Sequence, residues 1–276
     1  MRAKNGLSEN LMAAATWVAA AATIAALAFL VGFILFKGIP HIKPSLFSIQ
    51  YNSENVSLLP ALISTVMTTL LSLLIAAPLG IFAAIYLVEY AKRGSKAVAL
   101  VRMTTETLSG IPSIIYGLFG MLFFVTFLGW GFSLLAGSCT LAIMILPLIM
   151  RSAEEALKSV PNTFREGAFG LGSGKLRTVF RIVLPSAMPG IMAGIILAVG
   201  RIVGETAALI YTAGTVAQVP SNPMQSARTL SVHMYALSSE GLHTDEGYAT
   251  AVVLLLVVAL INALSARIAK HIGRNK

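Results

Sequence analysis

The sequence predicts an all-α membrane protein with six transmembrane helices, from its composition, its long apolar windows and the placement of its basic residues. Of 276 residues, 57% are apolar and 11% are charged, whereas soluble domains average about 45–50% and about 25%. The mean hydropathy is +0.83. These values exclude an ordinary soluble enzyme and equally a disordered or collagen-like chain. The single cysteine, Cys139, excludes an intrachain disulfide.

Six apolar windows of about 20 residues or more predict the spanning helices. In chain order they are Leu11–Phe36, Leu59–Val88, Leu108–Trp130, Phe132–Met150, Ser186–Thr212 and Tyr248–Ala269. The first window exceeds the apolar core of a signal peptide, about 7–15 residues, so we interpret it as a retained anchor. Residues 1–58 would hold this helix and an outer loop, and residues 59–276 a core of five helices. Only a Gly-Trp-Gly turn separates the third and fourth windows, which predicts a tight hairpin.

The Lys and Arg residues predict the orientation of the helices, because cytoplasmic loops carry an excess of them. Only Lys37, Lys43 and Arg228 fall on one side of the membrane. The other side holds Arg2, Lys4, Lys92, Arg93, Lys96, Arg102, Arg151, Lys158, Arg165, Lys175, Arg177, Arg181, Arg267, Lys270, Arg274 and Lys276. Both termini are therefore expected in the cytoplasm. The net charge of +9 reflects this topology, and no nucleic-acid partner is expected.

Small residues along the fifth window predict close contacts with a neighbouring helix. Gly190 and Gly194, and then Gly200 and Gly204, recur at four-residue spacing, which lets another helix approach closely. Several spans also contain a proline within them or near an end, namely Pro78, Pro112, Pro147 and Pro189. Such residues are tolerated in membranes where neighbours satisfy the freed carbonyls, and they favour bent helices.

The segment 151–185 is predicted to hold a short amphipathic helix outside the membrane. Pro161 suits its first turn, and Thr163 and Glu166 stand in capping-box spacing, so the start is open by a few residues. The helix would place Phe164, Ala168 and Phe169 on one side and would end at the glycines Gly170 and Gly172. These aromatic residues would pack either against the protein's own helix ends or in a groove on a partner.

The same segment resembles a known sequence pattern. Glu166-Gly167-Ala168 is followed after three residues by Gly172, and after nine more by Ile182-Val183-Leu184-Pro185. This spacing resembles the EAA loop of ABC-importer permeases, with Gly167 in place of the first alanine. The resemblance implies a type I (MetI-like) permease whose coupling helix inserts into a separate ATP-binding subunit. The coupling residues would be Thr163, Phe164, Arg165, Glu166, Gly167, Ala168, Phe169 and Gly172.

Gly172-Ser173-Gly174-Lys175 looks like the end of a phosphate-binding P-loop, but two positions exclude it. The motif requires glycine where this chain has Phe169, and serine or threonine where it has Leu176. The chain is therefore expected to hold no nucleotide or other cofactor, and the nucleotide site would lie on a partner. No histidine spacing in the outer loop is diagnostic of a metal site.

Arg201 and Glu205 are candidate pathway residues because both lie within the fifth apolar window. A charge at that depth is costly and usually faces a cavity or a partner. Four-residue spacing on a helix permits an ion pair that locks packing. Alternatively, the guanidinium is offered to an oxyanion, whose geometry suits arginine better than lysine. Thr206 would add a hydroxyl, and the two interpretations are compatible.

Two further runs carry a resemblance to one family. Gly200-Arg201-Ile202-Val203-Gly204-Glu205-Thr206-Ala207-Ala208 resembles the fifth-helix signature of phosphate ABC-importer permeases, more of the PstA type than the PstC type. The run 108–117 resembles the third-helix entry of the same family. This implies that Arg201 and Glu205 take part in phosphate passage. It also implies a bacterial inner-membrane complex with a second homologous permease, two copies of an ATP-binding subunit and an external phosphate-binding protein.

Other functions remain open from the sequence. A permease for another oxyanion, such as sulfate or molybdate, would keep the fold and the coupling loop and differ only in the cavity. An ion-coupled secondary transporter would need no ATPase, and the EAA spacing disfavours it. An enzyme embedded in the membrane is disfavoured because the spans offer a single obvious charged pair, Arg201 and Glu205. The chain is expected to be a transport subunit without a reaction of its own.

Overall fold

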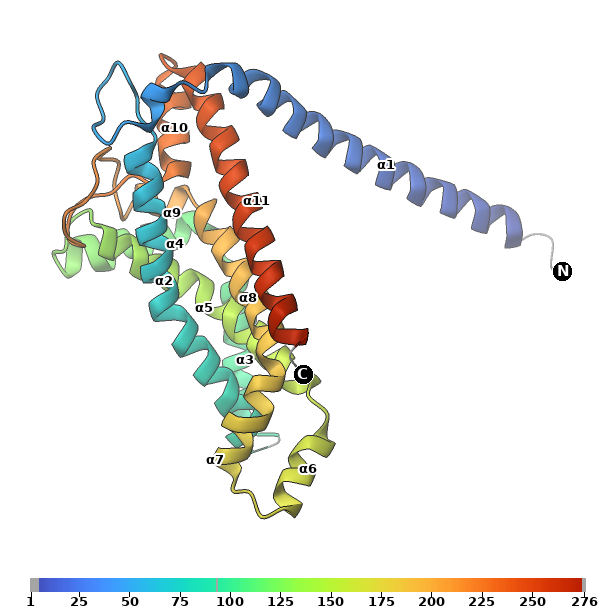
Figure 1. Cartoon of the computed structure of the whole chain (residues 1–276). Helices are drawn as coiled ribbons and strands as arrows, with labels where there is room; N and C mark the ends of the chain where they lie inside the picture. Colours follow the sequence, from blue (N-terminus) through green and yellow to red (C-terminus); the bar gives the residue numbers. More distant parts are fainter. Residues whose placement is uncertain (1–4, 93, 275–276) are drawn as a thin grey trace.

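The computed structural model describes residues 5–92 and 94–274, and every regular element in them is helical (Figure 1). The helices are α1 (Asn5–Gly38), α2 (Leu59–Ile85), α3 (Lys96–Ser109), α4 (Ser113–Gly120), α5 (Leu134–Ser159), α6 (Asn162–Gly170), α7 (Lys175–Thr178), α8 (Leu184–Val203), α9 (Ala207–Ile210), α10 (Leu230–Glu240) and α11 (Thr244–Arg274). Segments of π-helix continue these helices. Tyr86–Tyr90 extends α2, Met121–Phe127 extends α4, and Val179–Val183 joins α7 to α8. Short 3-10 turns, Ile39–His41 and Pro44–Phe47, follow α1.

The apolar windows form helices because a chain in lipid must satisfy its own backbone groups. Within the described residues, five helices are long and apolar enough to cross a membrane, or six when one bent pair counts as a span. The predicted all-helical fold with six windows is therefore confirmed in outline. Four basic residues used for orientation, Arg2, Lys4, Arg93 and Lys276, lie outside the described residues.

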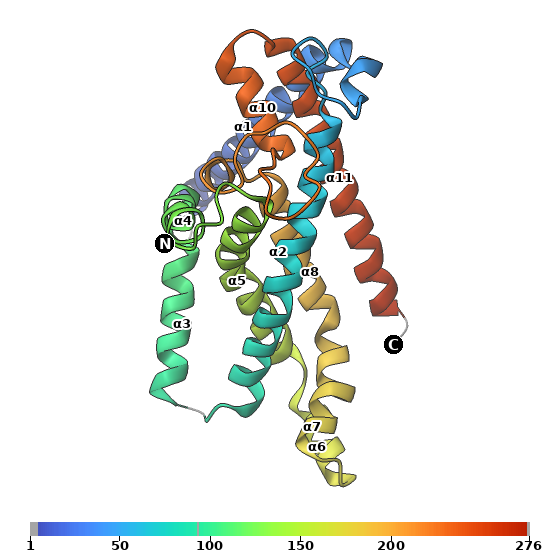
Figure 2. The same cartoon turned by 90° about the vertical axis from the view of Figure 1, so that its left-hand side faces the viewer.

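The third span differs from its prediction as one helix over 108–130. Two pieces, Lys96–Ser109 and Ser113–Phe127, meet at an angle of 101°. The bend falls at Gly110 and Pro112, because proline disfavours helix at the residue before it and lacks a donor N–H. α3 therefore begins well before the apolar window, and α4 runs across the top of α3 (Figure 2).

The fifth span also differs from the predicted single helix over 186–212. The helix begins at Lys175, continues through α8 and stops at Val203. The next turn, α9, begins after Glu205, whose carboxylate accepts the Ala208 N–H at 3.1 Å. A side chain that caps a new turn competes with continuation of the old helix, and the low helix propensity of Gly204 assists the break.

The core of the bundle is formed where α2, α5 and α8 pack together, with buried apolar side chains along all three helices. The predicted close approach at Gly190 and Gly194 is confirmed, since a Cβ there would overlap Ala156 and Ser152 of α5. Within the described chain no helix approaches Gly200, where a built Cβ meets no atom of another helix within 4 Å, or Gly204, where it meets only its own helix, so the prediction is not confirmed there.

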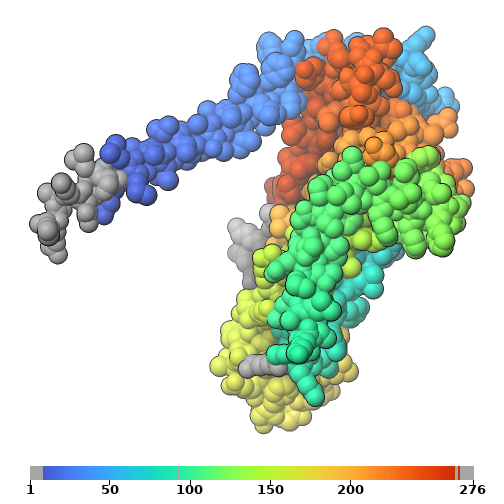
Figure 3. Space-filling model, turned by 180° about the vertical axis from the view of Figure 1, so that it is seen from behind, coloured from blue at the N-terminus to red at the C-terminus, as the bar shows by residue number. Residues whose placement is uncertain are grey.

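The helix α1 stands away from the bundle (Figure 1), and Figure 3 shows it as an arm projecting from one end. None of the residues in its most apolar window is buried. Its contact with the rest of the chain is at its last turns, where Phe33 meets Tyr248 of α11 edge to face at 5.9 Å. A long apolar helix in this position requires lipid or another protein around it.

The end of the bundle opposite α6 is closed by the segment 39–58 and by α10. Buried side chains of that segment pack against α10 and α11. His233 of α10 is fully buried, and its Nε2 lies 3.2 Å from the Val56 carbonyl oxygen. Its Nδ1 lies 3.4 Å from Arg228 Nη1. Because arginine can only donate, Nδ1 is the acceptor and Nε2 carries the proton.

Candidate functional site

The predicted coupling helix is α6, which lies between the ends of α5 and α7 (Figure 1). Its end is fixed by Gly172, whose φ of +77° favours glycine. The Gly172 N–H donates to the Phe169 carbonyl and the Ser173 N–H to the Ala168 carbonyl, both at 2.9 Å. This pair of bonds is the Schellman motif, which stops the helix. The predicted helix and its glycine end are therefore confirmed.

The start of α6 differs from a capping box. Asn162 is the first helical residue, and Pro161 occupies the N-cap position, where no side chain of the described residues caps the helix. Thr163 and Glu166 both lie inside the helix, so their spacing does not mark its start. Proline at this boundary costs nothing, because the N–H it lacks would be unpaired anyway.

Some side chains of α6 pack against the rest of the chain and others are exposed. Ala168 is buried against the chain, whereas Phe164 and Phe169 are 49% and 48% exposed. The three therefore do not share one buried side. Three more predicted coupling residues are exposed, Thr163, Glu166 and Gly167. Two half-exposed aromatic rings at the tip of the molecule form an apolar surface that a partner groove can accept.

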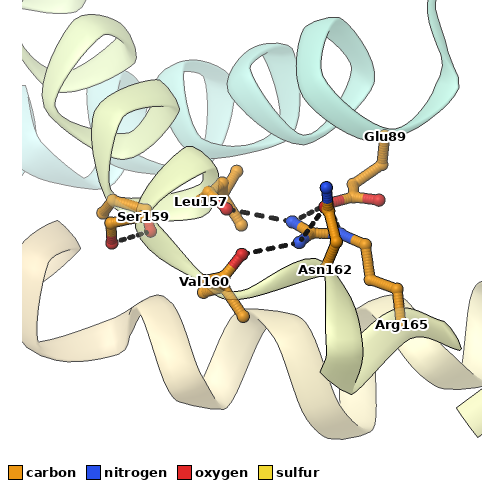
Figure 4. A network of polar contacts seen from close by, with 7 residues as sticks. Glu89, Leu157, Ser159, Val160, Asn162 and Arg165 are labelled. Atoms are coloured by element: carbon orange, nitrogen blue, oxygen red, sulfur yellow. Dashed lines mark hydrogen bonds and ion pairs between the residues drawn. The ribbon is translucent and has the colours of Figure 1, made fainter. Parts of the chain in front are cut away.

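Arg165 anchors α6 to the rest of the bundle (Figure 4). Its guanidinium donates to the Glu89 carboxylate from Nε at 3.0 Å and from Nη2 at 2.7 Å. It also donates to the carbonyl oxygens of Leu157 at 3.0 Å and Val160 at 2.8 Å. The Arg165 and Glu89 side chains are only 14% and 8% exposed. A bonded arginine therefore connects α6 to the ends of α2 and α5.

This network gives Arg165 a contact within its own chain, while its predicted part in coupling stays a prediction, and it adds a residue that the sequence did not indicate. Arg165 was predicted among the residues facing an ATP-binding subunit, but its guanidinium faces its own chain. Glu89 was not predicted as its partner, because the two positions are 76 residues apart and no local pattern links them. The only sequence signal was the position of Glu89 at the end of an apolar window.

Arg201 lies in the last turn of α8, half-buried, and Glu205 is buried just beyond the helix end. The ion pair predicted between them is absent from the described residues, where Arg201 has no acidic partner within 4 Å. Four-residue pairing requires a continuous helix, and this helix stops at Val203. Glu205 is engaged instead at the start of α9, and Thr206 precedes that turn half-buried.

Tyr116 of α4 belongs to the same buried cluster as Ile202, the residue after Arg201. The Tyr116 ring is buried, and its hydroxyl donates to the Leu108 carbonyl at 2.8 Å. Arg201 thus keeps a guanidinium without a carboxylate inside a membrane-spanning region. Such a group offers a planar fork of donors to an oxyanion, and its uncompensated charge makes an anionic ligand the expected partner.

Helices long and apolar enough to span a membrane, one of which carries Arg201, together with an anchored helix protruding from one end, are typical of an integral membrane transport subunit. The model of the family "Binding-protein-dependent transport system inner membrane component" matches residues 76–276. The chain belongs to this family of inner-membrane transport permeases, which confirms the predicted fold class and the multi-pass inner-membrane location.

Several relatives are similar over most of their length. The probable ABC transporter permease protein YqgI of Bacillus subtilis is 35% identical, with 69% of each chain covered. The phosphate transport system permease protein PstA of Xylella fastidiosa is 34% identical over 85% of this chain and 82% of the relative. PstA 1 of Mycobacterium tuberculosis is 34% identical over 75% and 68%.

Solved transporters share the fold. A subunit of a bacterial ABC transporter that imports alginate aligns with a TM-score of 0.69 and 16% identity, over 98% of this chain and 99% of that one. A chain of the inward-facing MetNI methionine transporter aligns with a TM-score of 0.60 and 22% identity, over 78% and 94%. These likenesses bear on the architecture alone.

Proposed function

We propose that this chain is the permease subunit of an ATP-driven phosphate importer and forms half of its translocation pathway. The observation that carries the substrate is Arg201, a half-buried guanidinium in the last turn of α8 without a carboxylate partner in the described spans. The names of the relatives from X. fastidiosa and M. tuberculosis support phosphate as the anion. Glu205 and Thr206 would border the pathway where α8 breaks.

The mechanism is alternating access driven from α6. Closure of the ATP-binding subunits moves the exposed rings of Phe164 and Phe169 with the partner groove. Because Arg165 bonds α6 to Glu89 and to the last carbonyls of α5, the movement passes to α2 and α5 together. Those two helices pack against α8, which carries Arg201. ATP can drive the cycle only by stabilising one state of this bundle more than the other.

The remaining partners follow from this role. Two copies of an ATP-binding subunit hydrolyse ATP at the α6 end, which faces the cytoplasm together with both termini. This chain binds no cofactor of its own and has no nucleic-acid partner. A second homologous permease completes the pathway, and the exposed surface of α1 is available to it. A phosphate-binding protein delivers phosphate at the opposite end.

The test is uptake of labelled phosphate into proteoliposomes that contain the assembled complex, with sulfate as competitor. The wild type is expected to transport phosphate with ATP and to ignore sulfate. Arg201→Gln should assemble and lose at least about 90% of uptake, since one charge-assisted contact supplies about 1.5–3 kcal/mol. Arg151→Gln is the matched control, because Arg151 is exposed on α5 and its ion pair among the described residues is with Glu155 of the same helix.

Two outcomes would overturn parts of this proposal. If assembled Arg201→Gln transports phosphate at the wild-type rate, the arginine serves packing and not passage. If the wild type transports sulfate or molybdate and not phosphate, the importer fold remains and the substrate assignment is wrong.

A further inference from the structure

A cavity of about 720 Å³ lies at the α6 end of the bundle, between the end of α2, the helix α3, the end of α5, and α6 with α7. Its wall contains five basic side chains, those of Lys92, Arg102, Lys158, Arg165 and Lys175. Among the described residues that line it, Glu89 is the single acid. The cavity is therefore strongly cationic.

The carboxylates nearby do not neutralise this charge. Arg165 uses Glu89, while Arg102 and Lys158 share one oxygen of Glu154, each at 2.7 Å. Both contacts are ion pairs in which Glu154 Oε1 accepts no well-aligned hydrogen bond. The Nε of Arg102 is also buried without an acceptor in the described structure. Two cations on one carboxylate leave positive charge and unused donors, which favours an anion in the cavity.

The two remaining lysines have no carboxylate partner among the described residues. Lys175 stands over the Tyr90 ring, with its Nζ 4.9 Å from the ring centroid. Lys92 has no ion pair in the part of the chain that the structure describes. Both line the cavity, and both can turn their ammonium groups to an anion.

A second hollow of about 350 Å³ adjoins the cavity, between the end of α2 and α3, which face each other in Figure 2. The two hollows share Leu87, Ala91, Lys92 and Val98. The second is lined further by Tyr86 and Tyr90, which are 60% and 41% exposed. Exposed tyrosines at the end of a span mark the membrane–water interface, so the cationic cavity opens onto an apolar groove at that level.

We propose that this double hollow binds an anionic phospholipid of the cytoplasmic leaflet. Its phosphate head group lies among Lys92, Arg102 and Lys175, and its glycerol and first methylenes lie in the groove beside Tyr86. The assignment to the cytoplasmic leaflet rests on the proposed function, which places the α6 end in the cytoplasm. Free phosphate would occupy a small part of 720 Å³ and leave the groove unused. A head group held by Lys92, Arg102 and Lys175 would connect the segment after α2 with α3 and α7 and would stiffen the support of α6.

The experiment measures binding of dioctanoyl phosphatidylglycerol to the purified, assembled complex by native mass spectrometry. Dioctanoyl phosphatidylcholine and inorganic phosphate serve as competitors. The double variant Lys92→Gln/Lys175→Gln should bind the anionic lipid about 30-fold more weakly, at about 1 kcal/mol for each lysine. Arg177→Gln/Arg181→Gln is the matched control, because both arginines lie in the same segment as Lys175, are exposed and do not line the cavity.

The proposal is overturned if the lysine variant binds as tightly as the wild type or no more weakly than the arginine control. It is also overturned if inorganic phosphate displaces the lipid at equal concentration. Displacement by the ATP-binding subunit, seen as binding to the isolated chain but not to the complex, overturns it in favour of a protein contact. Phosphate uptake is scored separately, so a complex that transports phosphate without binding lipid refutes only the lipid site.

Discussion

At the scale of single residues, the bond between Arg165 and Glu89 connects α6 to the end of α2, and the proposed mechanism predicts that coupling depends on it. Glu89→Gln keeps the shape of the side chain but removes the charge that faces a buried guanidinium. We expect the complex to lose about 1–3 kcal/mol of stability and to transport less phosphate for each ATP hydrolysed. The measurement is the ratio of uptake to hydrolysis in proteoliposomes, with thermal unfolding alongside.

The control for that variant is Glu155→Gln, which removes the exposed ion pair with Arg151 on α5. Exposed pairs contribute little, so this change should alter neither the ratio nor the unfolding temperature. An unchanged ratio in Glu89→Gln would mean that α6 drives the bundle through other contacts.

His233 gives the chain a pH dependence that can be measured. Burial, and next the charge of Arg228, lower the pKa of His233 to about 4, against about 6.5 in an unfolded chain. Between these values the unfolded chain binds the proton and the folded chain does not, so stability is lost as the pH falls below 6.5. Unfolding from pH 7 to pH 5 should become easier by about 2 kcal/mol.

The variant His233→Gln should lack this slope, because glutamine does not titrate. His243→Gln should retain it, since the His243 side chain is 30% exposed and lies 3.7 Å from Glu246. Denaturation of the detergent-solubilised chain at several pH values distinguishes the three proteins. A wild-type stability that stays flat between pH 7 and pH 5 would contradict the assignment of a neutral ring donating to Val56.

At the scale of helices, the contact between α5 and α8 depends on glycine at one position and not at another. A Cβ at Gly194 would overlap Ser152, whereas one at Gly200 would meet nothing within 4 Å. Gly194→Ala should therefore destabilise the bundle by about 1–3 kcal/mol through overpacking. Gly200→Ala should be neutral or stabilise it by up to about 1 kcal/mol through helix propensity.

Thermal unfolding of the two variants beside the wild type tests this difference within one helix. Equal effects of the two substitutions would mean that α5 and α8 are separated more widely than in this structure. Because Gly200 is next to Arg201, retained phosphate uptake in Gly200→Ala would also show that backbone flexibility there is not required for passage.

The helices themselves were predictable where the signal was local. The glycine end of α6 was predicted and is confirmed at Gly172, whereas Pro161, predicted in the first turn, lies at the N-cap just before the helix. The bend between α3 and α4 had a visible cause in Pro112, but the apolar window ran through it. Hydropathy measures burial in lipid and not the direction of the chain, so it cannot report an angle of 101°.

The site was less predictable for a physical reason. Arg201 and Glu205 were found because charge in an apolar window is costly, but their pairing assumed a continuous helix. Glu205 instead caps α9, through one bond to Ala208 N–H, and such competition between side chain and backbone is invisible in a periodic pattern. Glu89 was missed because only the folded bundle brings it to Arg165.

At the scale of the whole molecule, the two termini should lie on one side of the membrane. The last residue of α1, Gly38, lies against Tyr248 near the start of α11. Both helices therefore leave the same end of the bundle, and if each crosses the membrane, both termini reach the other face. An epitope tag at each terminus should be reached by protease only from the cytoplasmic side. Tags cleaved from opposite sides would contradict this arrangement.

The length of α5 has a mechanical consequence. This helix of 26 residues is about 39 Å long at about 1.5 Å per residue. At one end, Arg165 donates a hydrogen bond to the Leu157 carbonyl oxygen. At the other end, the Ser133 and Leu134 N–H groups donate to the carbonyl oxygens of Thr212 and Gln225. If α5 tilted as one body about its centre, a tilt of about 5° would shift each end by about 2 Å in opposite directions. A movement at the α6 end would then appear with reversed direction at the Ser133 end, where the chain bonds to Thr212 and Gln225.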